Sequence, residues 1–185
     1  MPLYTYPIPE ARPVAGGTTY YIIPGVDIYT IATSAPGGPK VLYSAFYVTT
    51  PIVIDQLAAE VTTQSSATTF SMAVYVADTS WQPGTQLAVS TGNSSASPGT
   101  KTASVSLALS PGRYLTAITA ADNTVQYRRG LGGMRYGAYA FGSNSATSRW
   151  QVSSTQTLQN PGTAWVAGSV TSGEEYYVWL RISVA

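Results

Sequence analysis

The sequence contains neither cysteine nor histidine, and it is poor in charged residues. Without histidine the chain cannot build a Ser-His-Asp triad, an imidazole proton shuttle or a histidine-ligated metal centre. Without cysteine it has no disulfide framework, no thiolate cluster and no thiol nucleophile. Composition alone therefore excludes most familiar hydrolase mechanisms.

Charged side chains make up only 9% of the 185 residues, with nine Lys and Arg against eight Asp and Glu. Globular proteins usually carry about 25% charged residues. A formal net charge of +1 provides no field that would gather phosphate groups or hold the chain on an acidic membrane surface. No stretch reaches the roughly 20 apolar residues that a spanning helix needs. We therefore expect neither a nucleic-acid partner nor a membrane.

The acidic residues offer no evident pair for glycoside hydrolysis. Asp78 and Asp122 have the sequence neighbours of turn residues. Asp55 and Glu60 are five positions apart, which on a regular strand places them on opposite faces, where they cannot both act on one glycosidic bond. The acids also lack the spacing of a calcium-binding loop. We expect a protein that is not an enzyme and that has no cofactor and no metal.

In place of charge the chain has strand-forming and turn-forming residues, including 14 Tyr, 17 Gly and 12 Pro. The clearest alternation puts Phe70, Met72, Val74 and Val76 on one face, which we expect to be core. Residues 55–60 also fit one helical turn, but the β-branched residues on both sides favour a strand. Further strands are expected over 41–49, 52–63, 103–109, 114–118 and 176–184, with a polar loop at 92–100. This spacing predicts an all-β domain over residues 41–185, a β-sandwich, of which the jelly roll is one form.

The first forty residues have a different composition. Seven of the 12 prolines lie there, around the short strand-like pieces 18–23 and 26–32. Because this segment has too few core residues to fold alone, we expect an extended arm over residues 1–40 that lies along the sandwich or reaches a neighbouring subunit. If it reaches a neighbour, its removal should leave unfolding of the sandwich largely unchanged. The residues expected to anchor it there are Tyr4, Tyr6, Ile8, Tyr20, Tyr21 and Ile22.

A second irregular region runs from about residue 122 to residue 162 and gathers arginine and aromatic residues. Such residues stack on sugar rings, and they are also common at protein–protein interfaces. A solvent-facing loop is the third interpretation. The glycines at 130–133 lack the other residues of a phosphate-binding loop. The residues expected to contact a partner protein or a glycan are Tyr127, Arg128, Arg129, Arg135, Tyr136, Tyr139, Arg149, Trp150 and Trp165.

Residues 41–119 carry a series of strand-and-turn patterns. They comprise YSAFYV at 43–48, PIVIDQL at 51–57, EVTT at 60–63, MAVY at 72–75, QPG at 82–84 and VSLALSPGRY at 105–114. Together they resemble a β-sandwich module of structural proteins of tailed bacteriophages, which decorates heads or forms the knobs of fibres, often as trimers. The resemblance implies a β-sandwich at the surface of a virion and no catalytic residue.

Two functions follow from these observations. The first is a non-enzymatic virion protein that decorates or cements the capsid, with further copies of itself in a homotrimer and the major capsid protein as partners. The second is a tail-fibre or receptor-binding tip that recognises host-surface carbohydrate. In the second, Tyr136, Tyr139, Trp150 and Trp165 would be the stacking platforms.

Overall fold

The computed structural model of the chain describes residues 10–11, 20–22, 30–34, 40–65, 69–79, 83–120, 124–131, 148–153, 170–172, 174–176 and 178–183. Every regular element among these residues is a β-strand, which confirms the all-β class. Within the same residues, no helix is long and apolar enough to cross a membrane.

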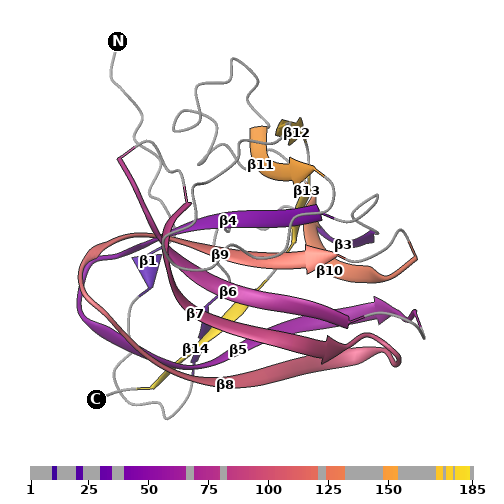
Figure 1. Ribbon diagram of the computed structural model, residues 1–185, viewed down its shortest axis with the longest axis horizontal. Coiled ribbons are helices and arrows are strands. Elements are labelled where there is room, and N and C mark those ends of the chain that lie inside the picture. Colours follow the sequence, from indigo (N-terminus) through magenta and orange to yellow (C-terminus); the bar gives the residue numbers. More distant parts are fainter. Residues whose placement is uncertain are drawn as a thin grey trace.

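The first sheet has the strand order β12-β11-β4-β9-β6-β7, with β1 beside β4 (Figure 1). All of its ladders are antiparallel except the short parallel pairing of β1 with β4. Its strands are β1 (Glu10–Ala11), β4 (Lys40–Val48), β6 (Thr69–Ala77), β7 (Pro83–Ser94), β9 (Gly112–Ala120), β11 (Ser148–Ser153) and β12 (Val170–Ser172).

The second sheet has the order β13-β10-β5-β14-β2, with β3 beside β10 and β8 beside β5. All of these pairings are antiparallel. Its strands are β2 (Tyr20–Ile22), β3 (Thr30–Ser34), β5 (Ile52–Thr63), β8 (Gly99–Leu109), β10 (Gln126–Leu131), β13 (Glu174–Tyr176) and β14 (Trp179–Ser183). Two packed antiparallel sheets make the predicted β-sandwich, and the jelly-roll form stays a prediction.

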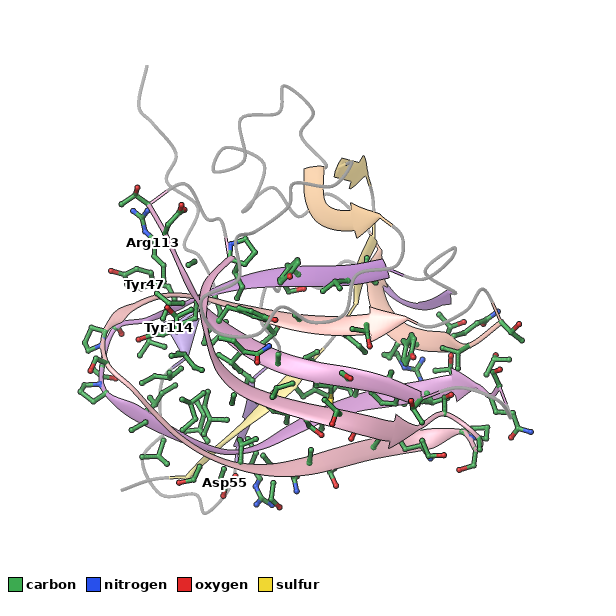
Figure 2. The ribbon with its side chains drawn as sticks, viewed as in Figure 1. Tyr47, Asp55, Arg113 and Tyr114 are labelled. Carbon is green, nitrogen blue, oxygen red and sulfur yellow. The ribbon has the colours of Figure 1, made fainter. Side chains whose placement is uncertain are left out.

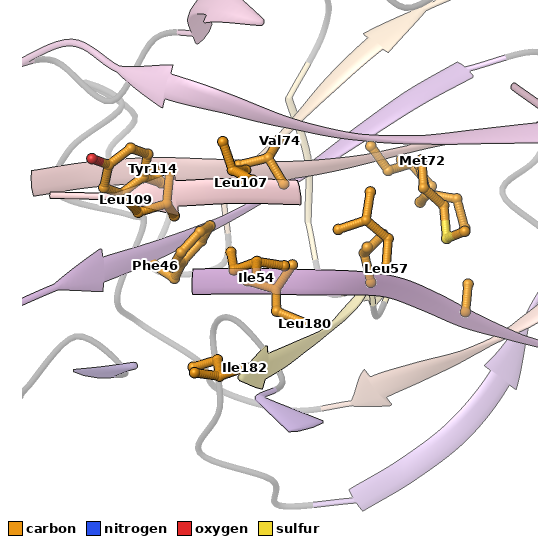
Figure 3. Packing of buried hydrophobic residues seen from close by; sticks show 14 of the residues in the cluster. Phe46, Ile54, Leu57, Met72, Val74, Leu107, Leu109, Tyr114, Leu180 and Ile182 are labelled. Carbon is orange, nitrogen blue, oxygen red and sulfur yellow. The ribbon is translucent and has the colours of Figure 1, made fainter. Parts of the chain in front are cut away.

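The core lies between the two sheets and takes alternate residues from β4, β5, β6, β8, β9, β10 and β14 (Figure 3). Phe46 and Met72 come from the first sheet, and Ile54, Leu57 and Leu180 from the second, all without measurable exposure. Aromatic contacts add to this packing, since Phe46 stacks on Tyr114 with 5.6 Å between ring centroids. The core is therefore built by the period-2 pattern that the sequence displays.

The outer face of the first sheet is also withdrawn from solvent on its central strands. Tyr43 and Tyr75 point away from the core cluster, yet they are 5% and 1% exposed, and their rings meet edge to face at 5.7 Å. Gln86 donates a hydrogen bond of 2.7 Å from Nε2 to the Tyr75 hydroxyl. The first sheet therefore buries apolar and paired polar groups on both faces.

The alternation on β6 is confirmed except at its end. Phe70, Met72 and Val74 belong to the core cluster, but Val76 is 38% exposed. Register shifts between β6 and β7 near Tyr75 accompany the change. The prediction that Val76 is a core residue is therefore wrong.

Pieces of the first forty residues pair with the sandwich of the same chain. β2 pairs with β14 through Tyr20, Tyr21 and Ile22, β3 pairs with β10, and β1 adds two residues to β4. Of the two arrangements expected for the arm, these pieces adopt the one that lies along the sandwich. The domain boundary at residue 40 stays a prediction.

Candidate functional site

The outer face of the second sheet carries the charged residues of β5. Leu57 and Val61 of this strand point into the core. The register against β14 pairs Gln56 with Arg181 and Ile54 with Ile182, so that Asp55 is an extra residue between them. Such a bulge reverses the alternation. It leaves Asp55 and Glu60 on the same outer face, and the expectation that they lie on opposite faces is wrong.

Each of these two carboxylates forms an ion pair with an arginine of a neighbouring strand. Arg128 on β10 donates two hydrogen bonds to Glu60, from Nε to Oε2 at 2.9 Å and from the terminal nitrogen to Oε1 at 2.7 Å. Arg181 on β14 donates one from Nε to Asp55 at 2.5 Å. The bidentate geometry matches the planar guanidinium fork. The two pairs tie β10 and β14 to β5.

The Arg128 pair also determines how Glu60 titrates. The hydrogen bonds from Arg128 lower the pKa of Glu60 below its usual 4.5, against a smaller opposing effect of burial. The same contact raises the pKa of Arg128. Glu60 is therefore ionised at neutral pH, and it is not suited to donate a proton as the general acid of a glycosidase.

An aromatic side chain lies among these charged groups. Trp179 of β14 is half-buried on the outer face, opposite Ala58 of β5, which in turn lies opposite Thr102 of β8. The next row on the same face contains Gln56 and Arg181. An indole beside amide and guanidinium groups is a combination that suits the face and hydroxyl groups of a sugar ring.

The edge strand β8 continues this face as a row of uncharged polar residues. From Thr100 to Leu109 its exposed positions alternate with covered ones. The exposed members are Thr100, Thr102, Ser104, Ser106 and Ala108. The start of this row was expected to be a loop, although the period-2 spacing of Thr and Ser was a signal of a strand with one face in solvent. Figure 2 labels Asp55 on this side of the molecule, far from Tyr47 and Arg113.

One predicted contact residue has a different role. Tyr127 is only 1% exposed, and its ring meets Phe70 edge to face at 5.3 Å between centroids. It lies on the core side of β10, whereas the next residue, Arg128, points outward to Glu60. Tyr127 is therefore a core residue in this chain and cannot contact a partner or a glycan without local unfolding.

The remaining predicted contact residues are only partly placed. Arg129 lies in β10 between Ala32 of β3 and Tyr176 of β13, and Arg149 and Trp150 lie in β11 beside β12. Arg135, Tyr136, Tyr139 and Trp165 lie outside the described residues, as do Tyr4, Tyr6 and Ile8 of the arm. The structure therefore does not bring this group together as one described surface, and its role stays a prediction.

No group of three or more metal-ligating side chains occurs in the part of the chain that the structure describes. Comparisons with protein families, with curated proteins and with solved structures found no match to this chain. The function of this protein is therefore inferred from the surface of the sandwich and from the resemblance of residues 41–119 to the bacteriophage module.

Proposed function

We propose that this protein is a non-enzymatic structural protein of a bacteriophage virion, a β-sandwich displayed on the particle surface that decorates or cements the capsid through contacts between subunits. Its partners are further copies of itself, in the homotrimer that the resemblance implies, and other virion proteins such as the major capsid protein. The virion setting rests on the resemblance of residues 41–119. The mode of action rests on the surface of the sandwich.

The observation that carries the mode of action is the outer face of the second sheet. Both carboxylates that β5 places on this face are engaged by arginines, and the adjoining edge strand presents exposed Ser and Thr residues. These groups give the described part of the face a fixed shape and fixed hydrogen-bonding groups, and the lowered pKa of Glu60 makes it unsuited to act as a general acid. This face supports a protein that functions through contacts with other proteins of the particle.

The proposal is tested on particles purified by density gradient from the source of this sequence. Quantitative mass spectrometry of the particles should find the chain in a fixed stoichiometry to the capsid protein, and an electron-microscopy map should show the sandwich on the particle surface. Particles of full protein composition that lack this chain would contradict the proposal. So would a catalytic rate of the purified protein that disappears in Glu60→Gln or Asp55→Asn.

A second candidate function is a tail-fibre or receptor-binding tip that recognises host-surface carbohydrate. The observation that favours it is the half-buried Trp179 beside Gln56 and Arg181 on the outer face. A glycan array followed by calorimetry on the isolated protein separates the two functions. A receptor-binding tip should bind at least one saccharide and lose that binding in Trp179→Ala, whereas a decoration protein should bind none.

A further inference from the structure

One side of the sandwich is formed by two long strands that each have a single neighbour. Among the described elements, β7 pairs only with β6 and β8 pairs only with β5 (Figure 1). A backbone hydrogen bond joins Ser65 to Ser95, beyond the ends of β5 and β7. No described strand other than β5 pairs with β8, so among the described residues its outer edge is open to another strand.

This edge lacks the usual protection. Natural edge strands are kept short, or carry charged residues or proline that prevent pairing with another chain. β7 and β8 have 12 and 11 residues. From Pro83 to Leu109 the sequence has one charged residue, Lys101, and its amino group donates to Ser97 at 2.9 Å, at the end of β8. The middle of β8 has no charged residue and no proline, and its one irregularity is the register shift against β5 between Ser104 and Leu107.

The core is incompletely covered on this same side. The partly buried residues that pack against the core cluster are Ala88 of β7 and Ala103 and Val105 of β8. Among the described residues, the large hydrophobic side chains with most exposure are Val76, Leu87 and Val89, on β6 and β7. Apolar groups that cluster at one edge of a sandwich indicate an interface. A partner seated against β7 and β8 would bury Ala88, Ala103 and Val105 more completely.

We propose that this partner is a second copy of the chain, and that β8 pairs antiparallel with its own counterpart about a two-fold axis at Ser104, the middle residue of the strand. β8 is chosen over β7 because its exposed and covered residues alternate from Thr100 to Leu109 and its register against β5 shifts once, whereas the register of β7 against β6 shifts three times. An antiparallel contact of a strand with itself is isologous, and it closes without leaving a free end for further chains.

The sequence of β8 is complementary to itself in this register. Ser104 lies opposite its counterpart, Thr102 opposite the counterpart of Ser106, and Ala103 opposite that of Val105. Thr–Ser pairs across strands form favourable hydrogen bonds, and directly opposed like charges are unfavourable. The two copies of Lys101 are six residues apart along the ladder, about 20 Å, so they do not repel each other strongly.

This contact goes beyond the proposed virion function and does not depend on it, because it requires only the free edge. Alone it predicts a dimer. Combined with a three-fold contact elsewhere on the molecule, it predicts a hexamer.

The test uses the absence of cysteine in the chain, so that an introduced thiol has no competitor. Ser104→Cys places two thiols opposite each other on the axis and should give a disulfide-linked dimer in high yield under mild oxidation. Thr100→Cys is the matched control, because it is exposed on the same strand but lies about 26 Å from its counterpart in this register. It should remain at least tenfold less cross-linked. Equal yields for the two variants, or none for either, would overturn the proposal.

A second experiment uses charge and needs no oxidation. Native mass spectrometry of the full chain should show dimers or hexamers. Ser104→Lys and Ser104→Glu should each weaken the association tenfold or more, because like charges then lie opposite each other. An equimolar mixture of the two variants should restore it as a mixed dimer. A trimer that both substitutions leave unchanged would contradict the two-fold contact, and unchanged melting temperatures of the variants would exclude misfolding as the cause.

Discussion

The ion pair between Arg128 and Glu60 makes the stability of the sandwich depend on pH in a defined direction. The pKa of Glu60 is lowered in the folded state by the hydrogen bonds from Arg128. The stabilisation is therefore complete above the ordinary pKa of 4.5 and is lost as the pH falls through the lower, folded-state value. Because both side chains are partly exposed, solvent screening keeps the contribution to about 1 kcal/mol or less.

A double-mutant cycle with Glu60→Gln and Arg128→Met tests this directly. Arg128→Met keeps much of the aliphatic stem, so the cycle isolates the charged contact. We expect a coupling free energy of roughly 0.5–1 kcal/mol near neutral pH, measured by urea unfolding. The coupling should fall toward zero as the pH drops below the lowered, folded-state pKa of Glu60, where the carboxyl is protonated in both states. A coupling that stays constant over this range would show that the interaction does not depend on the carboxylate charge.

The buried hydrogen bond between Gln86 and Tyr75 is a second single-residue determinant of stability. Both side chains are buried, and the bond is 2.7 Å long. Tyr75→Phe should cost about 1–3 kcal/mol of unfolding free energy, because it leaves an amide N–H of Gln86 without its acceptor. Tyr114→Phe is the control. Its hydroxyl donates to the carbonyl of Ser110 in a part-buried position that water can reach, so we expect a cost of about 0.5–1.5 kcal/mol. A larger loss of unfolding free energy for Tyr114→Phe than for Tyr75→Phe would contradict this account.

At the scale of the elements, β6 shows how far alternation alone predicts burial. Val74 and Val76 are on the same predicted face, but Val74 is fully buried and Val76 is 38% exposed. Val74→Ala should therefore cost about 1.5–3 kcal/mol in a denaturant titration, and Val76→Ala within about 0.5 kcal/mol of zero. The two variants make the same chemical change on one strand, so each is the control for the other. Similar losses for both would mean that a partner buries Val76 in solution.

The strands that face the core were predicted well, whereas the edge strand β8 was predicted only over residues 103–109. The expected ranges 41–49, 52–63 and 70–76 agree closely with β4, β5 and β6, because buried alternation produces a clear hydrophobic pattern. The expected polar loop at 92–100 instead includes the last residues of β7 and the first of β8. One face of an edge strand is exposed to solvent and carries polar residues. The pattern of hydrophobic residues that identifies a buried strand is therefore weak in an edge strand.

The candidate surface was harder to predict because it depends on details of strand pairing that the sequence pattern does not reveal. The bulge at Asp55 moves that residue to the same face as Glu60, and only the register of β5 against β14 reveals it. Tyr127 and Arg128 are adjacent in the sequence, and composition alone gave them the same role. Their alternation on β10 sends one into the core and the other to Glu60. The residue types predicted which chemical groups the chain offers, but the strand register determined the face of the sheet on which each residue lies.

At the scale of the whole molecule, the first forty residues act as part of the sandwich in the pieces that the structure describes. β2 covers the edge of β14, and β3 pairs with β10. Removing them would leave the backbone groups of β10 and β14 unpaired at a new edge. This differs from the expectation, drawn from proline content, that removal would leave unfolding of the sandwich unchanged.

Two truncations separate these possibilities. Deletion of residues 1–19 removes only β1 among the described strands, and deletion of residues 1–34 removes β2 and β3 as well. We expect the longer deletion to lower the melting temperature by several degrees more than the shorter, since each kcal/mol corresponds to roughly 2–4 °C in a domain of this size. Calorimetric melting of both truncated chains beside the full chain measures this difference. Identical melting of all three would mean that β2 and β3 contribute little to the sandwich, and it would favour an arm whose anchoring residues serve a neighbouring subunit.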